Sequence, residues 1–430
     1  MNLALWVLSI TMLDLNFILE NPEFIKKAAA SKGVTVDVDL IVKTALEMKP
    51  LFAKVQKLRE QRNVFAKEVS LARNGQREPL IEKGKLLKTE LDLLEKKLKT
   101  LHDEIHSLLT SLPNPPKSDV KVGKDDSENE VIRTYKKPTE FSFTPLDHLQ
   151  IGQSLDIIDM ERAAKVSGAR FAYLKGDGVL LEWALVRFAI DILIEEGFIP
   201  VVPPVLVKRE TMVGLGYMEN GGEEDMFSIP SDDLFLVGTA EQSVVPIHKD
   251  ETLDKKELPK RYVGFSPSFR REAGSYGKDT KGILRVHQFD KIEMVSFVAQ
   301  DKDDSEHEYL LSLEEKLFQA LDIPYQVVKM CSGDLGFPAA RKYDIEAWMP
   351  GQQKYREVTS TSTCTDFQSR RLKMRYRDGD KTEFLNVLNG TAFAVGRTII
   401  AILENYQQED GSVAIPEVLQ SYMGKKVIKK

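Results

Sequence analysis

Two long heptad repeats near the N-terminus constrain the fold of this chain more than any other feature. Apolar positions recur with alternating steps of three and four from residue 41 to 72 and from residue 80 to 112. The stretch between them, ARNGQREP, contains Asn74, Gly75 and Pro79, which do not favour a continuous helix. The sequence therefore predicts two helices of about 32 residues, each about 48 Å long, folded back on each other as an antiparallel coiled-coil arm. The first seam comprises Ile41, Thr44, Met48, Leu51, Val55, Leu58, Arg62, Phe65, Val69 and Ala72, and the second comprises Leu80, Gly84, Leu87, Leu91, Leu94, Leu98, Leu101, Ile105, Leu108 and Leu112.

Positive charge is concentrated on this arm. Residues 43–112 hold 15 Lys and Arg against 10 Asp and Glu, whereas the whole chain has a net charge of −6. Two interpretations stay open at this point: a solvated coiled coil that makes its own ion pairs, or a surface that contacts nucleic acid. The arm ends in the proline-rich SLPNPPKSD, and a polar stretch follows to Lys137. We therefore expect an N-terminal helical arm at 1–115, a linker at 116–137 and a second domain at 138–430.

The second domain has the pattern of an α+β fold. GVLLEWALVRFAIDILIEEGF predicts a long amphipathic helix that ends at Gly197, followed by a β-branched run that ends at Pro203 and Pro204. Strand-like segments follow around 234–237, 261–270, 283–297, 325–330, 343–349 and 384–389. Their hairpin-like spacing favours a mostly antiparallel β-sheet flanked by helices. No GxxxxGK[ST] phosphate loop is present, so a nucleotide would have to bind in another way.

The cysteine content and the N-terminal sequence indicate in which cellular compartment the protein is expected. Two cysteines in 430 residues indicate a reducing environment, so we expect a cytoplasmic protein. Cys331 and Cys364 are expected to be core thiols, and no zinc is expected. The apolar start MNLALWVLSITML lacks the early basic residues and cleavage site of a signal peptide and is too short to span a bilayer. No membrane association is expected, and Met12 is a candidate start.

An unusually charged strand pair lies in SPSFRREAGSYGKDTKGILRVHQFDKIE, residues 266–293. Along a strand, alternate side chains point to the same face. On the first run this places Arg270 and Glu272 together, and on the second run it places five residues on one face. Buried charges must be paired or must bind a ligand, so this face is predicted to bind a polyanion, with ion pairs across the strands as the alternative. The second run presents Arg285, His287, Phe289, Lys291 and Glu293.

This run resembles motif 2 of the class II aminoacyl-tRNA synthetases, in the form found in seryl-tRNA synthetases. Residues 180–204 resemble motif 1, and LNGTAFAVGRTIIAILENYQ at 388–407 resembles motif 3 with its arginine, Arg397. The resemblance extends from about Met12 to the C-terminus and includes the basic helical hairpin. It implies a homodimeric ligase that activates L-serine with ATP and transfers the seryl group to the 3′ end of tRNA(Ser), which the arm would bind; charging of tRNA(Sec) is left open. A catalytically inactive synthetase-like RNA-binding or interaction protein and a carrier-protein aminoacyl ligase remain as alternatives.

The resemblance also assigns the ATP site. It places Arg270 at the α-phosphate and Arg285 and Arg397 at the γ-phosphate, with Phe289 stacked on adenine and Glu272 accepting from the adenine amino group. Guanidinium groups bind phosphate oxygens bidentately, and an aromatic ring supplies a stacking face. Arg270, Glu357 and Arg397 are the expected catalytic residues, and His287 is expected to be structural. The complete expected ATP site comprises Arg270, Arg271, Glu272, Arg285, Val286, Phe289, Glu357, Val358, Thr359, Ser360 and Arg397.

For serine, the resemblance assigns the stretch LVGTAEQS and residues of motifs 2 and 3. Thr239 and Glu241 would bind the substrate amine, although Thr239 with Gln242 also fits a capping box at a helix start. The expected serine site comprises Thr239, Ala240, Glu241, Glu293, Asn389 and Thr391.

A magnesium site is expected in KYREVTSTSTCTDFQSRR, which has the composition of a strand. By resemblance, Glu357 and Ser360 hold the Mg²⁺ that bridges the ATP phosphates, and hard oxygen ligands suit that ion. Simple alternation places residues three apart on opposite faces of a strand, so this assignment requires a bend. A solvated Ser/Thr strand is the alternative.

Overall fold

The computed structural model describes residues 13–72, 77–219, 221–273 and 281–430. The chain divides into two compact units, Met1–Pro113 and Asn114–Lys430, which we describe separately. The proposed start at Met12 and the turn residues Asn74 and Gly75 lie outside the described residues. None of the described helices is both long and apolar enough to cross a membrane.

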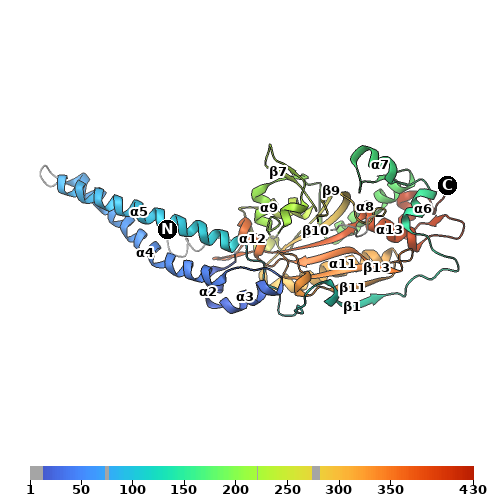
Figure 1. The fold of residues 1–430 in the computed structure, drawn as a ribbon, viewed down its shortest axis with the longest axis horizontal. Coiled ribbons are helices and arrows are strands. Elements are labelled where there is room, and N and C mark those ends of the chain that lie inside the picture. Colours follow the sequence, from blue (N-terminus) through green and yellow to red (C-terminus); the bar gives the residue numbers. More distant parts are fainter. Residues whose placement is uncertain (1–12, 73–76, 220, 274–280) are drawn as a thin grey trace. The chain divides into compact units, whose positions relative to one another are not determined.

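The first unit is dominated by the expected helical hairpin (Figure 1). Helices α2 (Leu15–Glu20) and α3 (Pro22–Ser31) precede α4 (Val38–Leu71) and α5 (Arg77–Thr110), which have 34 residues each. Asp37 caps α4 by accepting from the backbone N–H of Leu40 at 2.8 Å. Pro79, which we expected in the turn, lies instead in the first turn of α5, where a missing N–H costs no helical hydrogen bond.

The two heptad seams face each other as predicted. Val55 and Leu58 of α4 are buried against Leu91 of α5, and Leu87, Leu94 and Leu98 pack beside them. Arg62 is exposed, so the apolar seam weakens toward the turn. Three ion pairs join the helices across the seam: Lys54 with Glu90, Arg59 with Glu95, and Lys97 with Glu47, at 2.7–2.8 Å.

An eight-stranded sheet forms the centre of the second unit, in the order β1-β11-β12-β13-β16-β10-β9-β4. All neighbours are antiparallel except β4 and β9, which are parallel, and this confirms the expected α+β fold with a mostly antiparallel sheet. The strands are β1 (Glu130–Tyr135), β4 (Ile199–Val201), β9 (Lys260–Phe269), β10 (Gln288–Val298), β11 (Tyr325–Lys329), β12 (Arg341–Met349), β13 (Lys354–Thr363) and β16 (Asn386–Ala394).

Different helices cover the two faces of this sheet. Helices α8 (Asp177–Glu195), α11 (Asp303–Ala320) and α13 (Val395–Asn405) pack on the face that carries Ile292 and Met294. Figure 1 shows α8 beside α13. Helices α9 (Arg209–Leu215), α10 (Glu241–Val244) and α12 (Phe367–Leu372) contact Val295 and Phe297 on the opposite face. Helix α8 ends at Glu195, and Gly197, predicted to close it, follows two residues later with a φ of +84° that suits glycine.

The remaining elements are short. The helices are α6 (His148–Ser154), α7 (Met160–Ser167) and α14 (Glu417–Met423). The strands are β2 (Ile158–Asp159), β3 (Tyr173–Leu174), β5 (Leu206–Lys208), β6 (Ser228–Ile229), β7 (Leu234–Leu236), β8 (Thr252–Asp254), β14 (Arg375–Asp378), β15 (Lys381–Phe384), β17 (Val413–Ala414) and β18 (Val427–Ile428).

Two local expectations differ from the structure. The segment 116–137, expected as a linker, contains strand β1, which pairs with β11 at the edge of the large sheet, and the backbone N–H of Lys117 donates to the carbonyl of Ala340 at 2.9 Å. This segment is therefore part of the second unit. The charged strands are also shorter than expected: β9 ends at residue 269 and β10 begins at residue 288, so Arg270, Arg285 and His287 lie just outside the strands.

Candidate active site

A cluster of buried acidic and hydroxyl side chains, which we call the acidic pocket, forms where α10 meets strands β10 and β16. Glu293 of β10 is 1% exposed, and its partner in the register of β16 is Thr391. The Glu293 carboxylate lies 2.5 Å from the Lys291 ammonium and accepts from the Thr239 hydroxyl at 3.1 Å. The Thr391 hydroxyl lies 3.5 Å from the same carboxylate, a distance that makes at most a weak hydrogen bond. Three predicted serine-binding residues, Thr239, Glu293 and Thr391, therefore converge.

A second carboxylate, Glu241, lies in the same pocket and is 4% exposed. Its Oε2 accepts from the Tyr217 hydroxyl at 2.8 Å, and its Oε1 accepts from the Gln368 amide at 3.0 Å. Burial raises the pKa of the Glu241 carboxyl, and the negative charge of Glu293 raises it further. Glu293 pairs with the Lys291 ammonium, whereas Glu241 is held by neutral donors, so the two carboxyl groups are paired with one lysine within the described residues.

The capping box expected as an alternative for this stretch forms only in part. Helix α10 begins after Ala240, and the Thr239 hydroxyl accepts from the backbone N–H of Glu241 at 3.3 Å while it donates to Glu293. Gln242 accepts from the backbone N–H of Gly238 at 2.8 Å, so it holds the turn that precedes the helix. The side chain of Thr239 is thus available to the pocket.

Arginine side chains gather beside this acidic pocket. Arg270 follows β9 directly, and its Nε donates to the Gly238 carbonyl at 3.2 Å. Its guanidinium lies 5.3 Å from the centre of the Phe289 ring. Arg271 lies over another ring, that of Phe227, at 5.8 Å. Because Gly238 adjoins Thr239, the arginine cluster and the acidic pocket are contiguous.

The other two predicted phosphate ligands are held by carboxylates. Arg285 pairs with Glu272, whose φ is +54°. Arg397, on α13, lies 3.0 Å from the Glu357 carboxylate and also donates to the Glu357 carbonyl at 3.0 Å. Each guanidinium therefore has an anionic partner that a triphosphate would replace or share.

A β-bulge supplies the bend that the magnesium assignment requires. In the pairing of β12 with β13, Ile345 faces Thr359 and Glu346 faces Glu357, so Val358 is an extra residue on β13. Directly paired residues point to the same face of a sheet, and Asp344 pairs with Ser360. Since Asp344 and Glu346 are two apart and share a face, Glu357 and Ser360 share it too.

Two carboxylates at this bulge are paired with cations, Glu357 with Arg397 and Asp344 with Lys342. Desolvation raises the pKa of the Glu357 carboxyl, but Arg397 and Lys342 outweigh this effect and lower it to about 2. Glu357 is therefore ionised at neutral pH. Burial raises the pKa of Asp344 to about 7, although nearby Lys342 opposes this rise. An ionised carboxylate and the Ser360 hydroxyl form a hard oxygen pair of the kind that Mg²⁺ prefers, so the residues fit this ion.

Comparisons with known proteins identify the family. The N-terminal domain of seryl-tRNA synthetases matches residues 12–116, and the class II core domain of the synthetases for Gly, His, Pro, Ser and Thr matches residues 226–406. A serine–tRNA ligase of Thermodesulfovibrio yellowstonii is 44% identical over 97% of this chain and 100% of its own length; one of Thermobifida fusca is 46% identical over 97% and 99%. The chain belongs to the seryl-tRNA synthetase family.

Solved structures agree with this assignment. The seryl-tRNA synthetase of Pyrococcus horikoshii complexed with ATP is 42% identical, with a TM-score of 0.90 over 97% of this chain and 99% of that one. The cytoplasmic serine–tRNA ligase of Naegleria fowleri in complex with AMP is 32% identical, with a TM-score of 0.86 over 97% and 99%. The family, the class II fold and the activity of a serine–tRNA ligase are thereby confirmed, and the two alternative functions are not favoured.

Three residues expected in the ATP site of this synthetase have side chains that point away from that site. Val286 and Val358 are buried in the apolar core with α8, α11 and α13. The Thr359 hydroxyl donates to Glu314 of α11 at 2.7 Å and so lies on the opposite face of the sheet. These three residues can line a nucleotide site only through their backbone. His287 is held by the carbonyl of Arg270 at 2.9 Å and by the rings of Phe171 and Phe227, as befits a structural residue.

Sequence reasoning missed Tyr217 and Gln368, which bond both oxygens of Glu241. They come from the end of α9 and from α12, far from the three motifs along the chain, and no spacing in the sequence connects them with Glu241. Asn389, which was expected near serine, is 8% exposed and lies 3.9 Å from the Cys364 sulfur. Cys331 and Cys364 are buried free thiols, as expected.

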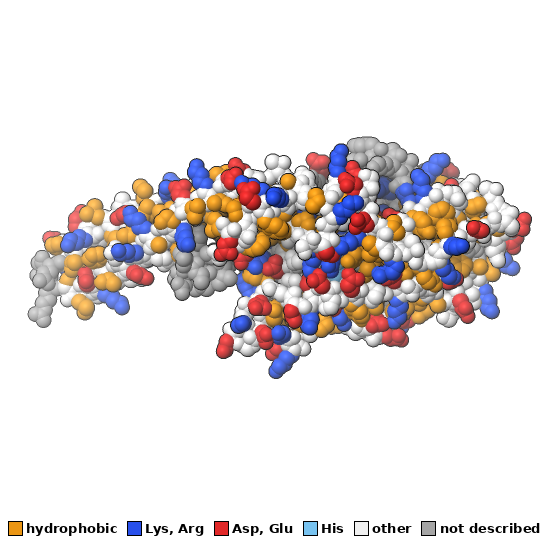
Figure 2. Space-filling view, turned by 90° about the horizontal axis from the view of Figure 1, so that it is seen from below, with side chains coloured by type: hydrophobic (Ala, Val, Ile, Leu, Met, Phe, Trp, Pro, Cys, Tyr) orange, Lys and Arg blue, Asp and Glu red, His pale blue; other side chains and the backbone are white. Residues whose placement is uncertain are grey.

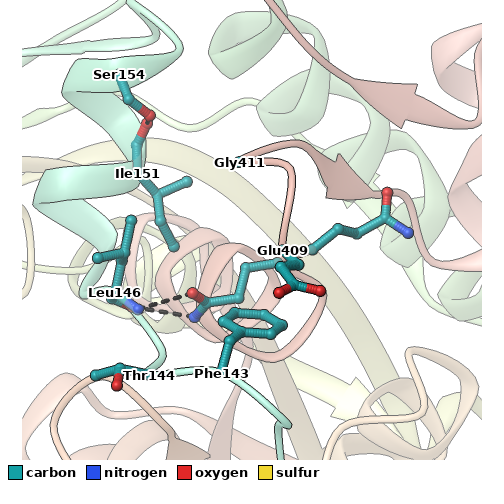
Figure 3. Close-up of a pocket in the computed structure, with 9 residues that line it drawn as sticks. Phe143, Thr144, Leu146, Ile151, Ser154, Glu409 and Gly411 are labelled. Atoms are coloured by element: carbon teal, nitrogen blue, oxygen red, sulfur yellow. Dashed lines mark hydrogen bonds between the residues drawn. The ribbon is translucent and has the colours of Figure 1, made fainter.

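A separate pocket of about 240 Å³ lies between the segment 143–154 and the turn 407–411 (Figure 3). Gln407 bridges the backbone of Leu146 there, donating to its carbonyl at 3.0 Å and accepting from its N–H at 2.7 Å. None of the expected serine or ATP residues lines it. The candidate active site therefore lies at the acidic pocket and the arginine cluster rather than in this separate pocket.

Proposed function

We propose that the sheet face bearing Glu241, Glu293 and Arg270 binds serine and ATP side by side and forms seryl-adenylate. One observation carries this proposal: the stretch Gly238–Thr239 touches both halves of the site. The Gly238 carbonyl accepts from Arg270, and the Thr239 hydroxyl donates to Glu293. A substrate ammonium and a phosphate could therefore bind within one contiguous surface. Relatives named serine–tRNA ligase, and structures with ATP or AMP, support the same proposal.

Serine binds in the acidic pocket. Its ammonium group lies between Glu241 and Glu293, of which only Glu293 makes an ion pair with a lysine, Lys291, within the described residues. The hydroxyls of Thr239 and Thr391 are placed to hydrogen-bond polar groups of the substrate, and Ala240 and Asn389 line the pocket. A site of this kind rejects an analogue without the hydroxyl because its own polar groups would be left unpaired.

ATP binds across the arginine cluster. Adenine stacks on Phe289 and contacts Glu272, while Arg270 binds the α-phosphate and Arg285 and Arg397 bind the γ-phosphate. Arg271 and the backbone of residues 286 and 358–359 complete the nucleotide site. Glu357 and Ser360 would hold Mg²⁺, which would supply positive charge that neutralises the phosphates.

Catalysis in the first step requires positioning and charge neutralisation. The serine carboxylate attacks the α-phosphorus, the bond from that phosphorus to the bridging oxygen breaks, and pyrophosphate leaves. Because the carboxylate is already ionised, no general base is needed, and Arg270 stabilises the charge that develops on the phosphorus oxygens. In the second step a ribose hydroxyl of the tRNA 3′ end attacks the acyl carbon, and AMP leaves.

The helical arm binds tRNA(Ser), with tRNA(Sec) as a further substrate to be tested. Figure 2 shows Lys and Arg side chains mixed with acidic and apolar ones along the hairpin. Lys57, Arg62, Lys83 and Lys88 are exposed and make no ion pair among the residues that the structure describes. Cations without protein partners are available to the phosphates of a tRNA backbone.

The protein acts as a homodimer through the outer edge of strand β4. Within the described residues β4 has one neighbour in the sheet, β9, so its other edge is open. Large apolar side chains are exposed on β4 and directly after it, where Ile199 is 49% and Val202 86% exposed, and Trp183 of α8, a helix that contacts β4, is 63% exposed. A second copy of this chain would cover this apolar surface. Sedimentation velocity should find a dimer for the wild type and a monomer for Val202→Glu; a monomeric wild type would contradict this part of the proposal.

We place the protein in the cytoplasm, since Cys331 and Cys364 are free thiols in a chain that forms no disulfide between them.

The proposed function is tested by ATP–pyrophosphate exchange with the purified protein. We expect exchange that depends on serine and is at least 100-fold weaker with alanine or glycine, because one unpaired buried hydrogen-bonding site typically costs about 10²-fold or more. Charging of tRNA(Ser) should follow. Exchange that does not depend on serine would refute the assignment of the acidic pocket.

A further inference from the structure

A buried histidine outside the expected site, His148, contacts the segment that leads into β10. Its Nε2 lies 3.2 Å from the backbone nitrogen of Ile283, and the residue is 5% exposed. The neighbouring Gly282 has φ +69°, and a Cβ at that position would lie 2.0 Å from Nε2. The imidazole ring therefore occupies space that only glycine leaves open, and ring and turn fit closely together.

The hydrogen bonds of His148 determine its tautomer. A backbone N–H can only donate, so Nε2 must accept from Ile283 and carries no proton. The proton is then on Nδ1, which donates to Oε1 of Glu404 at 3.1 Å. Glu404 is fully buried on α13 and also accepts from the backbone N–H of His148 at 3.1 Å and of Gly351 at 2.9 Å. Three donors thus hold the carboxylate, and the carboxylate holds the ring.

This chain of bonds ends at two of the phosphate-binding arginines. The residue after Ile283, Leu284, accepts through its carbonyl from Arg397 Nε at 3.3 Å, and Arg285 follows directly. Arg397 and Glu404 lie on the same helix, α13, seven residues apart. His148 therefore connects the turn that carries Arg285 to the helix that carries Arg397.

We propose that His148 is a positioning residue for the arginines that bind the ATP phosphates. This inference rests on the proposed roles of Arg285 and Arg397. His148 touches neither arginine and acts by fixing the turn 282–285 against α13. Without the Nε2 acceptor, the buried N–H of Ile283 loses its partner, and the turn can shift to find another. A displacement of about 1 Å at a phosphate ligand can reduce the rate about 10²-fold.

His148→Asn tests this bond with little other change. The Asn amide can still donate to Glu404 but is too short to reach Ile283. We expect kcat/KM for ATP in serine-dependent exchange to fall about 10²-fold through both a higher KM and a lower kcat, while KM for serine stays within about twofold. His148→Gln, whose carbonyl can take the place of Nε2, should recover most of the loss. Gly282→Ala perturbs the same contact from the other side and should reproduce the defect toward ATP.

His248→Asn is the matched control, since His248 is also buried and contacts a carboxylate, Glu251, and a hydroxyl, that of Tyr262, without touching the turn 282–285. Thermal unfolding establishes whether each variant is folded. If His148→Asn does not fold, the ATP kinetics of Gly282→Ala test the inference in its place. Wild-type ATP kinetics in the folded variants would overturn the inference, as would an equal loss toward ATP and serine or an equal loss in the control. If Arg397→Ala retained the full exchange rate, the proposed role of Arg397 in ATP binding would be refuted. That result is distinct from one that refutes the positioning role of His148.

Discussion

Replacing Tyr217 by Phe tests whether Glu241 binds the serine ammonium group. The substitution removes only a hydroxyl, which donates to Glu241 Oε2 at 2.8 Å, and keeps the aromatic ring. Glu241 would retain its bond from Gln368 at 3.0 Å and would lose one of its two side-chain partners. We expect the variant to fold and to bind serine poorly.

The size of the loss follows from the burial and charge of this hydrogen bond. Hydrogen bonds to charged groups contribute about 1.5–3 kcal/mol, and the remaining Gln368 bond favours the lower part of that range. A loss of about 1.5–2 kcal/mol corresponds to a decrease of about 10- to 30-fold in kcat/KM for serine. Because the Tyr217 bond opposes the burial that raises the pKa of Glu241, its removal raises that pKa further. Protonated Glu241 cannot bind an ammonium ion, so the defect should grow as the pH falls.

Serine-dependent exchange at pH 6 and pH 8 measures both effects. KM for ATP should remain within about twofold of wild type, since no phosphate ligand changes. Tyr376→Phe is a suitable control, because Tyr376 also donates to a carboxylate, Glu383, but in the separate sheet formed by β14, β15 and β8. An unchanged kcat/KM for serine at both pH values, or an equal loss in the control, would refute the role of Glu241.

Three further predictions address the pocket, the core and the arm. Thr391→Val should lower kcat/KM for serine by an amount set by one buried hydrogen bond, about 1–3 kcal/mol, without changing ATP binding; unchanged serine kinetics would show that Thr391 does not read the substrate. Burial raises the pKa of Glu314 well above its usual range, so the unfolded chain ionises first and the free energy of unfolding falls as pH rises above about 4.3. As pH rises above about 4.3, Glu314→Gln should therefore become more stable relative to wild type, by up to about 1.4 kcal/mol per pH unit, and parallel pH profiles of the two proteins in urea denaturation would contradict this. The combined substitution Lys57→Gln, Arg62→Gln, Lys83→Gln and Lys88→Gln should preserve the exchange rate, lower the rate of tRNA charging and make that rate less dependent on salt concentration. Undiminished charging would mean that the arm does not bind tRNA through these cations.

Features governed by local chemistry could be predicted from the sequence. The heptad seams place Val55 and Leu91 in contact because a repeat of 3.5 residues leaves one apolar stripe on each helix. Gly197 follows the end of α8 because glycine adopts positive φ without strain. Glu293 and Thr391 come from motifs with a recognisable resemblance, and the structure brings them together.

Features that depend on distant contacts could not be predicted. Strand β1 was interpreted as part of a linker because it lies in a mostly polar stretch, and its exposed residues form a strand only by pairing with β11. The bulge at Val358 was required by the expected magnesium ligands, yet nothing in a run of Ser and Thr shows where the extra residue lies. Tyr217, Gln368 and His148 act through partners 24 to 256 residues away in the chain, which periodicity does not detect.

Serine-dependent ATP–pyrophosphate exchange by Arg270→Ala, beside wild type, tests the central claim most directly. Arg270 joins the two halves of the site, because it bonds the Gly238 carbonyl next to the acidic pocket and lies over the Phe289 ring. Losing one transition-state donor costs about 10²-fold or more, so a folded variant should lose at least that much of the wild-type exchange rate. An exchange rate within about twofold of wild type would contradict the proposal that this face of the sheet activates serine.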